Sequence, residues 1–213
     1  MRRGIGTTFL LIVFLVGLSP APAKSENDDL EAAVDLSPDV ENGQALYDLC
    51  APCHGADAQG SKSGLIPQLA GQHRRVLIHQ LEEFRTRIRP SEDMEGITNR
   101  GAIGGPQDVA DLVGYIETLP LSKKPRLGPG FDLAWGRALY QMHCETCHGE
   151  TGDGNADQGI PRIHGQHYPY LIKQLLAFRD RVRTTPTLKM VIRIKALSEE
   201  ELSTIADYIA RLE

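Results

Sequence analysis

The sequence predicts an all-α protein built from two tandem copies of one domain, and two observations predict it. First, NGQALYDLCAPCHG (42–55) aligns with WGRALYQMHCETCHG (135–149), and IPQLAGQHRRVLIHQLEEFRTRIR (66–89) aligns without a gap with IPRIHGQHYPYLIKQLLAFRDRVR (160–183). A repeat of this length indicates a duplicated domain. Second, apolar residues recur at intervals of three and four within each copy, and no strand-like alternation of comparable length occurs.

The first 23 residues have the pattern of a signal peptide. Arg2 and Arg3 precede an apolar run from Phe9 to Leu18, and APA at 21–23 has the small residues that signal peptidase requires. The apolar run is shorter than the ~18 to 20 residues that span a bilayer, which disfavours a membrane anchor. We therefore expect residues 1–23 to direct export to a periplasm-like compartment and then to be removed.

The remaining chain divides into four segments. Residues 24–36, KSENDDLEAAVDL, are acidic and predict a loose N-terminal extension. The stretch LPLSKKPRLGPG (119–130) contains three prolines and two glycines, which disfavour regular structure, so we expect a linker at 120–130. The first domain is then expected at 37–119 and the second at 131–213.

The first helix of each domain should carry the start of the repeated motif. Ser37-Pro38 predicts a cap and a first helical position, after which Gly43 and Tyr47 lie on one face. Gly136 and Tyr140 repeat this spacing in the second copy.

A middle helix is predicted in both copies by one apolar stripe: Leu77, Leu81, Phe84 and Ile88, and Leu171, Leu175, Phe178 and Val182. The last helix has Pro106 in its first turn in copy one, and in copy two it opens on a capping box of Ser198 and Glu201. Three or four helices in roughly 90 residues make a thin core, because small domains bury a smaller share of their surface. We therefore expect a large apolar group at each centre.

Charge is unevenly shared between the copies. Residues 24–126 carry 17 acidic and 11 basic side chains, whereas residues 127–213 carry 11 and 10. The phosphates of a nucleic acid would be repelled by such a surface, so nucleic acid is excluded as a partner. The acids permit a basic protein partner, and they equally serve solubility alone.

All four cysteines belong to two copies of one pentapeptide, Cys-x-x-Cys-His, which supplies Cys50, Cys53 and His54, and Cys144, Cys147 and His148. Redox dithiols would need a thioredoxin-like strand and helix that are missing here. Paired zinc ligands normally lie ~15 to 20 residues apart, far closer than these. Disulfides within each motif suit an exported protein but leave both histidines unexplained.

Covalent haem attachment accounts for every residue of the motif. Thiols at positions i and i+3 reach two vinyl groups of one porphyrin, and the following histidine is carried to the iron. The sequence therefore predicts two haem c groups, bound through Cys50, Cys53, Cys144 and Cys147, with His54 and His148 as axial ligands.

Each repeat has one methionine placed to be the second axial ligand. Met1 leaves with the signal peptide, and Met142 lies too close to its own attachment motif to reach the far face of that haem. Met94 and Met190 remain, one just beyond each middle helix, although a lone methionine is more often core filler. With both axial positions filled, neither iron is expected to bind a small-molecule substrate, and an electron carrier is predicted.

The other histidines have weaker alternatives. His73 and His167 occupy matched positions and offer bis-histidine ligation as an alternative, but a place at the surface or between the domains is favoured. No matched partner exists in the other repeat for His79, His143 or His164. A ligating histidine usually gives its other ring N–H to an acceptor, and the carbonyl of Pro67 or Pro161 can serve, a simple turn being the alternative.

These residues resemble the dihaem cytochrome c4 family of class I c-type cytochromes over nearly all of residues 37–213. The matching pieces are ALYDLCAPCHG and ALYQMHCETCHG, PQLAGQH and PRIHGQH with the helix that follows, the downstream methionine, and LSEEELSTIADYIARL. The resemblance implies two cytochrome c folds packed about a pseudo-twofold axis, each around one covalent haem. It also implies Pro67 and Pro161 as hydrogen-bond acceptors for the two haem histidines.

The same resemblance implies a periplasmic protein, often loosely associated with the membrane, that relays electrons between a respiratory complex and a terminal oxidase. Two rivals keep the same cofactors: a dihaem oxidoreductase such as a peroxidase or thiosulfate-oxidising enzyme, and the cytochrome subunit of a larger dehydrogenase. The glycine-rich stretch after Met94 departs from the second copy and is where a displaceable ligand would lie. The more acidic first copy is expected to have the lower reduction potential.

Overall fold

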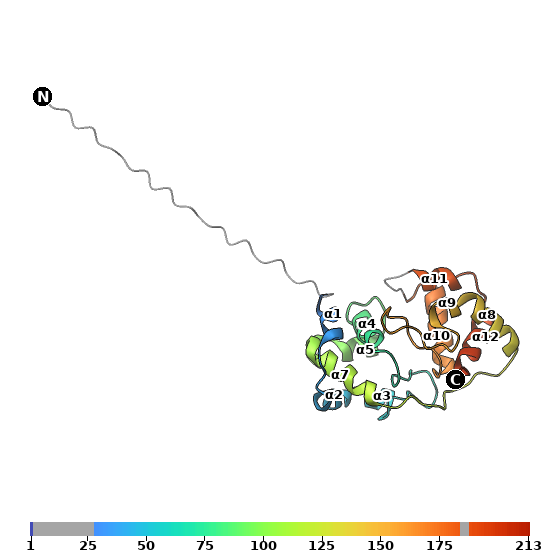
Figure 1. Cartoon of the computed structure of the whole chain (residues 1–213), viewed down its shortest axis with the longest axis horizontal. Coiled ribbons are helices and arrows are strands. Elements are labelled where there is room, and N and C mark those ends of the chain that lie inside the picture. Colours follow the sequence, from blue (N-terminus) through green and yellow to red (C-terminus); the bar gives the residue numbers. More distant parts are fainter. Residues whose placement is uncertain (2–27, 184–187) are drawn as a thin grey trace.

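The computed structural model describes Met1, residues 28–183 and residues 188–213. The expected signal peptide, apart from Met1, lies outside the described residues. The described part is helical without a strand, which confirms the all-α prediction (Figure 1). Its helices are α1 (Asp28–Asp35), α2 (Val40–Tyr47), α3 (Ala51–His54), α4 (Arg74–Arg85), α5 (Glu92–Thr98), α6 (Arg100–Ile103), α7 (Pro106–Thr118), α8 (Leu133–His143), α9 (Glu145–His148), α10 (Tyr168–Arg179), α11 (Lys189–Ile194) and α12 (Glu199–Ala210).

Two domains lie side by side, α1 to α7 in one and α8 to α12 in the other (Figure 1). Each has its own core of buried side chains, built in the first domain around Ile78, Leu112 and Val113 and in the second around Leu139, Leu202 and Ile205. None of the described helices has the length and apolar character needed to cross a bilayer.

The glycine of each repeated motif lies where the first and last helices of a domain cross. A Cβ atom on Gly43 would lie 2.0 Å from the carbonyl oxygen of Asp111, and one on Gly136 would lie 2.8 Å from that of Thr204. Real Cβ atoms do not approach other atoms so closely. Only glycine therefore lets α2 pack on α7, and α8 on α12, at this distance.

Two of the three expected helix starts are confirmed. Pro106 is the first residue of α7, and Ser198 and Glu201 form the capping box of α12. The expected start at Ser37-Pro38 is wrong, because Asp39 caps α2 with its carboxylate on the backbone N–H groups of the first turn. A carboxylate accepts these hydrogen bonds readily and also suits the positive end of the helix.

The middle helices are shorter than their apolar stripes predict. In both copies the backbone enters the left-handed region just after the helix, with φ of 59° at Arg87 and 57° at Arg181. Helix α4 therefore ends at Arg85 and α10 at Arg179. The last member of each stripe, Ile88 or Val182, lies beyond the helix and is 41% or 63% exposed.

The acidic N-terminal segment is ordered from residue 28 onward and is not a loose extension. Helix α1 packs against α4 and α7, with Ala33 fully buried. Arg74 fixes the end of this segment, because its guanidinium donates to the backbone carbonyls of Ala33, Val34 and Leu36. Satisfying three carbonyls at the end of a helix is what a C-terminal cap does.

The two domains are joined by reciprocal hydrogen bonds that match under the repeat. The side-chain amide of Gln72 donates to the carbonyl of Arg162 (2.8 Å) and accepts from its backbone N–H (3.0 Å). Gln166, the equivalent of Gln72, makes the same pair of bonds with the backbone of Gln68, at 2.9 and 3.0 Å. Because the same surface of each copy is used, the arrangement is that of a pseudo-twofold pair.

Candidate haem and iron sites

Each Cys-x-x-Cys-His motif folds as a single helical turn. The backbone N–H of His54 donates to the carbonyl of Cys50, and that of His148 to the carbonyl of Cys144, both at 2.9 Å. Residues three apart on a helical turn lie on the same side, so each pair of thiols faces one direction. All four cysteines, Cys53 and Cys147 included, are free thiols.

The surroundings of the cysteines disfavour the dithiol and zinc interpretations. Burial, together with the second cysteine of each motif, raises the pKa of Cys50 to about 11 and that of Cys144 to about 12. The thiolate is the reactive form of a redox dithiol, and Cys50 and Cys144 are protonated at neutral pH. Among residues 28–183 and 188–213, moreover, no three Cys, His, Asp or Glu side chains gather closely enough to hold a metal ion.

The two motif histidines have the same environment. His54 and His148 are 5% and 8% exposed, and each Nδ1 lies 3.0 Å from a prolyl carbonyl, that of Pro67 or of Pro161. A carbonyl only accepts, so Nδ1 carries the proton and Nε2 keeps its lone pair for a metal. The predicted role of both prolines as acceptors matches this geometry.

Burial holds both imidazoles in the neutral form. Burial lowers the pKa of His54 and His148, although the hydrogen bond to the prolyl carbonyl opposes the change. The positive charge of Arg89 lowers the pKa of His54 further. Neutral imidazole is the form that binds iron.

A tyrosine in each domain holds the turn that follows the histidine. Tyr47 donates to the carbonyl of Gly55 (2.7 Å), and Tyr140 donates to that of Gly149 (2.5 Å). Both glycines have φ of 81°, a conformation that strains any other residue. Burial, chiefly, raises the pKa of both tyrosines, so the phenols remain neutral donors.

The two candidate methionines lie on corresponding short helices. Met94 is on α5, which packs against α4, and Met190 is on α11, which packs against α10; both are half-buried. Met190 packs against the second core, which also contains Cys144. Within the described residues Met94 belongs to neither core cluster. Their service as axial ligands remains a prediction.

A buried cationic cluster lies between the domains, and the sequence interpretation missed it. Arg89 and Arg183 are each 7% exposed. The side-chain amide oxygen (Oε1) of Gln174 accepts from both, at 3.1 and 2.7 Å. Arg89 also donates to the hydroxyl of Tyr170 (2.6 Å), and Arg183 pairs with Glu83 (2.9 Å). The matched arginines at the end of both 24-residue repeats were the signal that could have found it.

The residues present fit haem c. The cluster sets two guanidinium groups against one carboxylate, and Nε of Arg183 is buried without a hydrogen-bond partner among the described residues. An orphaned buried donor beside excess positive charge calls for an anion. Haem supplies carboxylates, and Arg89 already lies within electrostatic reach of His54. The thiols suit the vinyl groups of haem, the neutral imidazoles suit its iron, and the arginines suit its carboxylates.

His73 and His167 join the domains. Nε2 of His73 lies 2.6 Å from the carbonyl of Asp153, and Nε2 of His167 lies 2.8 Å from that of Gln59. Nδ1 of His167 accepts from the backbone N–H of Arg126 (3.0 Å), so both of its ring nitrogens are used. The favoured position of His73 and His167 between the domains therefore agrees with the structure, whereas the alternative of bis-histidine ligation does not.

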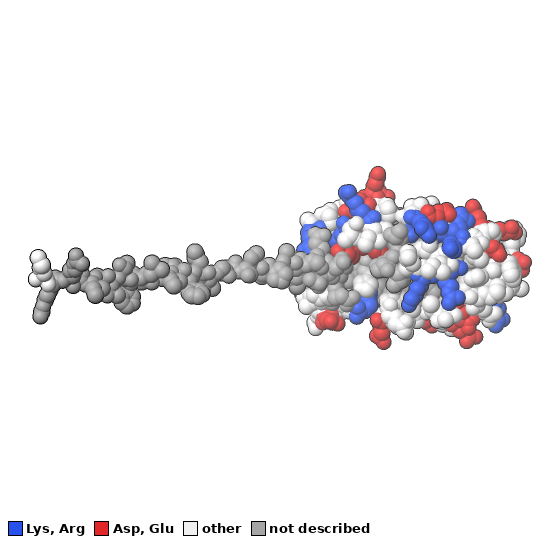
Figure 2. Space-filling model, turned by 90° about the horizontal axis from the view of Figure 1, so that it is seen from above, with Lys and Arg blue, Asp and Glu red and all other residues white. Residues whose placement is uncertain are grey.

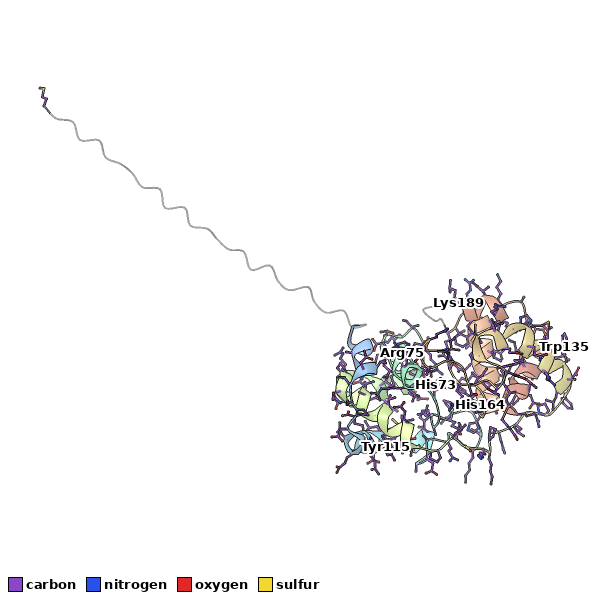
Figure 3. The ribbon with its side chains drawn as sticks, in the orientation of Figure 1. His73, Arg75, Tyr115, Trp135, His164 and Lys189 are labelled. Atoms are coloured by element: carbon purple, nitrogen blue, oxygen red, sulfur yellow. The ribbon has the colours of Figure 1, made fainter. Side chains whose placement is uncertain are left out.

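A cleft of about 500 Å³ opens between α1, the start of α4 and the second domain. His73 and Arg75 line it, and Figure 3 shows both on the border of the first domain. Neither attachment motif contributes a residue to its lining.

Comparisons with known proteins agree with this geometry. The family model described as Cytochrome c matches residues 40–120 and 133–213. Cytochrome c4 of Azotobacter vinelandii is 31% identical over 82% of this chain and 89% of its own length, and that of Pseudomonas aeruginosa is 33% identical with the same coverage. A protein of Stutzerimonas stutzeri named thiosulfate dehydrogenase electron acceptor is 30% identical over 76% of this chain and 78% of its own.

Solved structures share the fold. The reduced cytochrome c4 of Pseudomonas stutzeri superposes with a TM-score of 0.73 at 27% identity, over 83% of this chain and all of that one. Thiosulfate dehydrogenase of Marichromatium purpuratum gives the same TM-score at 29% identity, over 82% of this chain but only 40% of its own. With two matched domains, two attachment motifs and these relatives, the chain belongs to the cytochrome c family as a dihaem electron-transfer cytochrome of the c4 type, with two covalently bound haem c groups.

Proposed function

We propose that the protein relays electrons in the periplasm between redox proteins of a respiratory chain, from a donor complex to a terminal oxidase or another acceptor. Cys50 and Cys53 carry the first haem and Cys144 and Cys147 the second. His54 with Met94, and His148 with Met190, would hold the two haem irons. When bound, haem iron supplies one-electron chemistry between the ferric and ferrous states.

The single observation that carries this proposal is the duplicated contact between Nδ1 of a buried histidine and a prolyl carbonyl, at 3.0 Å in both domains. This contact fixes the ring and its tautomer before any ligand binds, so the ligand geometry need not change with the iron's charge. The interdomain hydrogen bonds of Gln72 and Gln166 hold the two sites in one rigid pair. Such an arrangement suits electron transfer better than substrate turnover.

Location and partners are supported by the sequence and by the names of the relatives. The N-terminal 23 residues have the features of an export signal. One curated relative is named a subunit of a cbb3-type cytochrome c oxidase and another an acceptor of thiosulfate dehydrogenase. Redox proteins are therefore the proposed partners, with peripheral contact to a membrane complex included.

The experiment separates a carrier from an enzyme. Purified holoprotein is reduced with dithionite, titrated with ferricyanide, and then exposed to carbon monoxide and to cyanide. A carrier takes up and returns two electrons per chain and binds neither ligand rapidly. Rapid binding by one of the two haems contradicts the proposal and supports the dihaem oxidoreductase with a displaceable ligand at Met94.

A second candidate function is direct acceptance of electrons from a thiosulfate dehydrogenase. The relatives named thiosulfate dehydrogenase electron acceptor, 30% and 34% identical to this chain, favour it. The protein would be reduced by thiosulfate only when a purified thiosulfate dehydrogenase is present. Reduction without that enzyme, or none with it, contradicts this candidate.

A further inference from the structure

The two methionine-bearing helices expose opposite charge. Helix α5 carries the exposed Glu92 and Asp93 and the half-buried Glu95, which pairs with Arg87 (3.0 Å), and the corresponding residues of α11 are Leu188, Lys189 and Val191. Two residues after the methionine, α5 has glycine and α11 has Ile192. The repeat therefore preserves the methionine and replaces its acidic surroundings with apolar and basic ones.

The outward face of α11 combines an apolar ridge with a basic ridge. Leu188 and Ile192 are 61% and 63% exposed and lie four residues apart, so they share one side of the helix. Lys189 and Arg193 are both exposed and form the neighbouring ridge with the same spacing. We call these four residues the α11 face.

The opposite side of α11 is fixed in the domain. Val191 and Ile194 are 3% and 1% exposed, and Met190 packs against the second core together with Cys144. A partner on the α11 face would thus lie one helix thickness from the proposed iron ligand. The helix itself is held by the core and needs no partner to form.

Figure 2 looks down on the side of the molecule that carries α11 in Figure 1, and it shows Lys and Arg side chains gathered on the second domain around an uncharged area. Figure 3 places Lys189 on the same outer edge. Lys195, exposed just beyond the helix, adds to the positive rim. Within the described residues, Lys189, Arg193 and Lys195 form no ion pair with the protein's own acids.

We propose that the α11 face is the docking surface for an electron-accepting metalloprotein whose redox centre is surrounded by acidic residues. An apolar centre with a charged rim is suited to brief encounters, which bury less than ~1,200 Å². Opposite charge steers such encounters and like charge suppresses them, so the exposed Glu92 and Asp93 of α5 would disfavour the same partner there. Charge complementarity thus selects the second domain.

This inference rests on the proposed function and identifies the domain from which the electron leaves the protein. The more acidic first domain is expected to have the lower potential, so an electron that enters there moves to the second domain. The second haem, when bound and ferrous, would give one electron to the oxidised metal of the docked partner, which would be reduced. No bond forms or breaks in this step.

The test uses reduced holoprotein and oxidised plant plastocyanin, an acidic copper protein, as the probe. The variant Lys189→Glu with Arg193→Glu reverses the basic ridge, and Lys123→Glu with Lys124→Glu makes the same charge change on the exposed linker as the matched control. At low ionic strength the first variant should react about tenfold or more slowly, with a much weaker salt dependence. The rate of reaction of the linker variant with plastocyanin should fall far less.

A second variant tests the apolar ridge. Ile192→Ser should weaken the complex by a factor that persists at high salt, because the lost contact is not ionic. The proposal would be overturned if the linker charge reversal slowed the reaction with plastocyanin as much as the α11 charge reversal does. Overall charge alone would then explain both rates. The proposal would also be overturned if vesicles containing phosphatidylglycerol sedimented the native protein but not the α11 variant, which would assign the face to a membrane.

Failure of this proposal is distinguishable from failure of the proposed function. Every variant is first reduced and titrated with ferricyanide. Two electrons per chain in all of them, with identical plastocyanin rates, would reject the docking surface and leave the carrier intact. Fewer electrons in the native protein would reject the carrier itself.

Discussion

The side-chain amide of Gln72 pairs with the backbone of Arg162 across the domain boundary, donating to its carbonyl at 2.8 Å and accepting from its N–H at 3.0 Å. Both hydrogen-bonding groups of one peptide are thus satisfied by one side chain from the other domain. Gln166 repeats this relationship with Gln68. The repeat therefore conserves the means by which its two copies recognise each other.

Replacing Gln72 should loosen the domain interface. Gln72→Ala leaves the partly buried N–H and carbonyl of Arg162 without partners, at a cost of about 1–3 kcal/mol in the free energy of unfolding. Denaturant unfolding of the holoprotein measures it. Gln158→Ala, at an exposed glutamine, is the control and should change stability by less than about 0.5 kcal/mol. Equal effects of both substitutions would contradict the assigned role.

Glycine 43 should be irreplaceable, because Gly43→Ala puts a Cβ atom against the carbonyl of Asp111. Overpacking of this kind costs about 1–3 kcal/mol or more, so the first domain should unfold at lower denaturant. Gly96→Ala is the matched control, since nothing lies within 4 Å of its Cβ position and α5 should gain up to about 1 kcal/mol. Unchanged stability of Gly43→Ala would show that α2 and α7 do not cross this closely.

Acid should weaken the packing of α2 on α7 through Asp111. Burial opposes ionisation of Asp111, but hydrogen bonds from Asn42, the backbone of Asp39 and Gln107 hold its pKa below the ordinary value. A depressed pKa contributes stability above the unfolded value of ~3.9, and that contribution is lost as pH falls through the folded pKa.

The unfolding free energies of the native protein and Asp111→Asn should therefore differ most near neutral pH and converge below about pH 4. Urea unfolding at a series of pH values measures the difference. Asp157→Asn, at an exposed acid of the second domain, serves as the control. A difference that stays constant with pH would contradict the account of Asp111.

The two reduction steps should be assignable by exchanging one axial ligand at a time. Histidine in place of methionine lowers the potential of a haem, because methionine is the ligand that raises it. In a potentiometric titration, Met94→His should lower the lower of two steps and Met190→His the upper one. The reverse assignment would contradict the expected effect of the acidic first domain.

The domain repeat, the all-α fold and the attachment motifs were predictable because each depends on local pattern. An apolar helix stripe and a five-residue motif each involve only residues that are close together in the sequence. The ends of α4 at Arg85 and of α10 at Arg179 were not predictable, since the left-handed residues that follow them, Arg87 and Arg181, leave no mark in the apolar periodicity. The start of α2 was misplaced because Ser37, Pro38 and Asp39 are all plausible starting residues.

Contacts between the copies could not be read from the sequence. Glu83 of the first domain pairs with Arg183 of the second, yet the equivalent of Glu83 is Ala177, so the repeat itself hides the pairing. The order of residues 28–36 was missed for a similar reason. Acidic composition predicts disorder, whereas Arg74, some forty residues away, supplies the cap that holds this segment.

The most direct test of the account is the absorption spectrum of the pure holoprotein, oxidised and reduced, with haem counted per chain. Two haem c groups per chain are predicted, with a far-red sulfur-to-iron band in the ferric spectrum whose intensity corresponds to two methionine-ligated centres. One haem per chain, or a band with half that intensity or none, would contradict a relay through two closed iron sites.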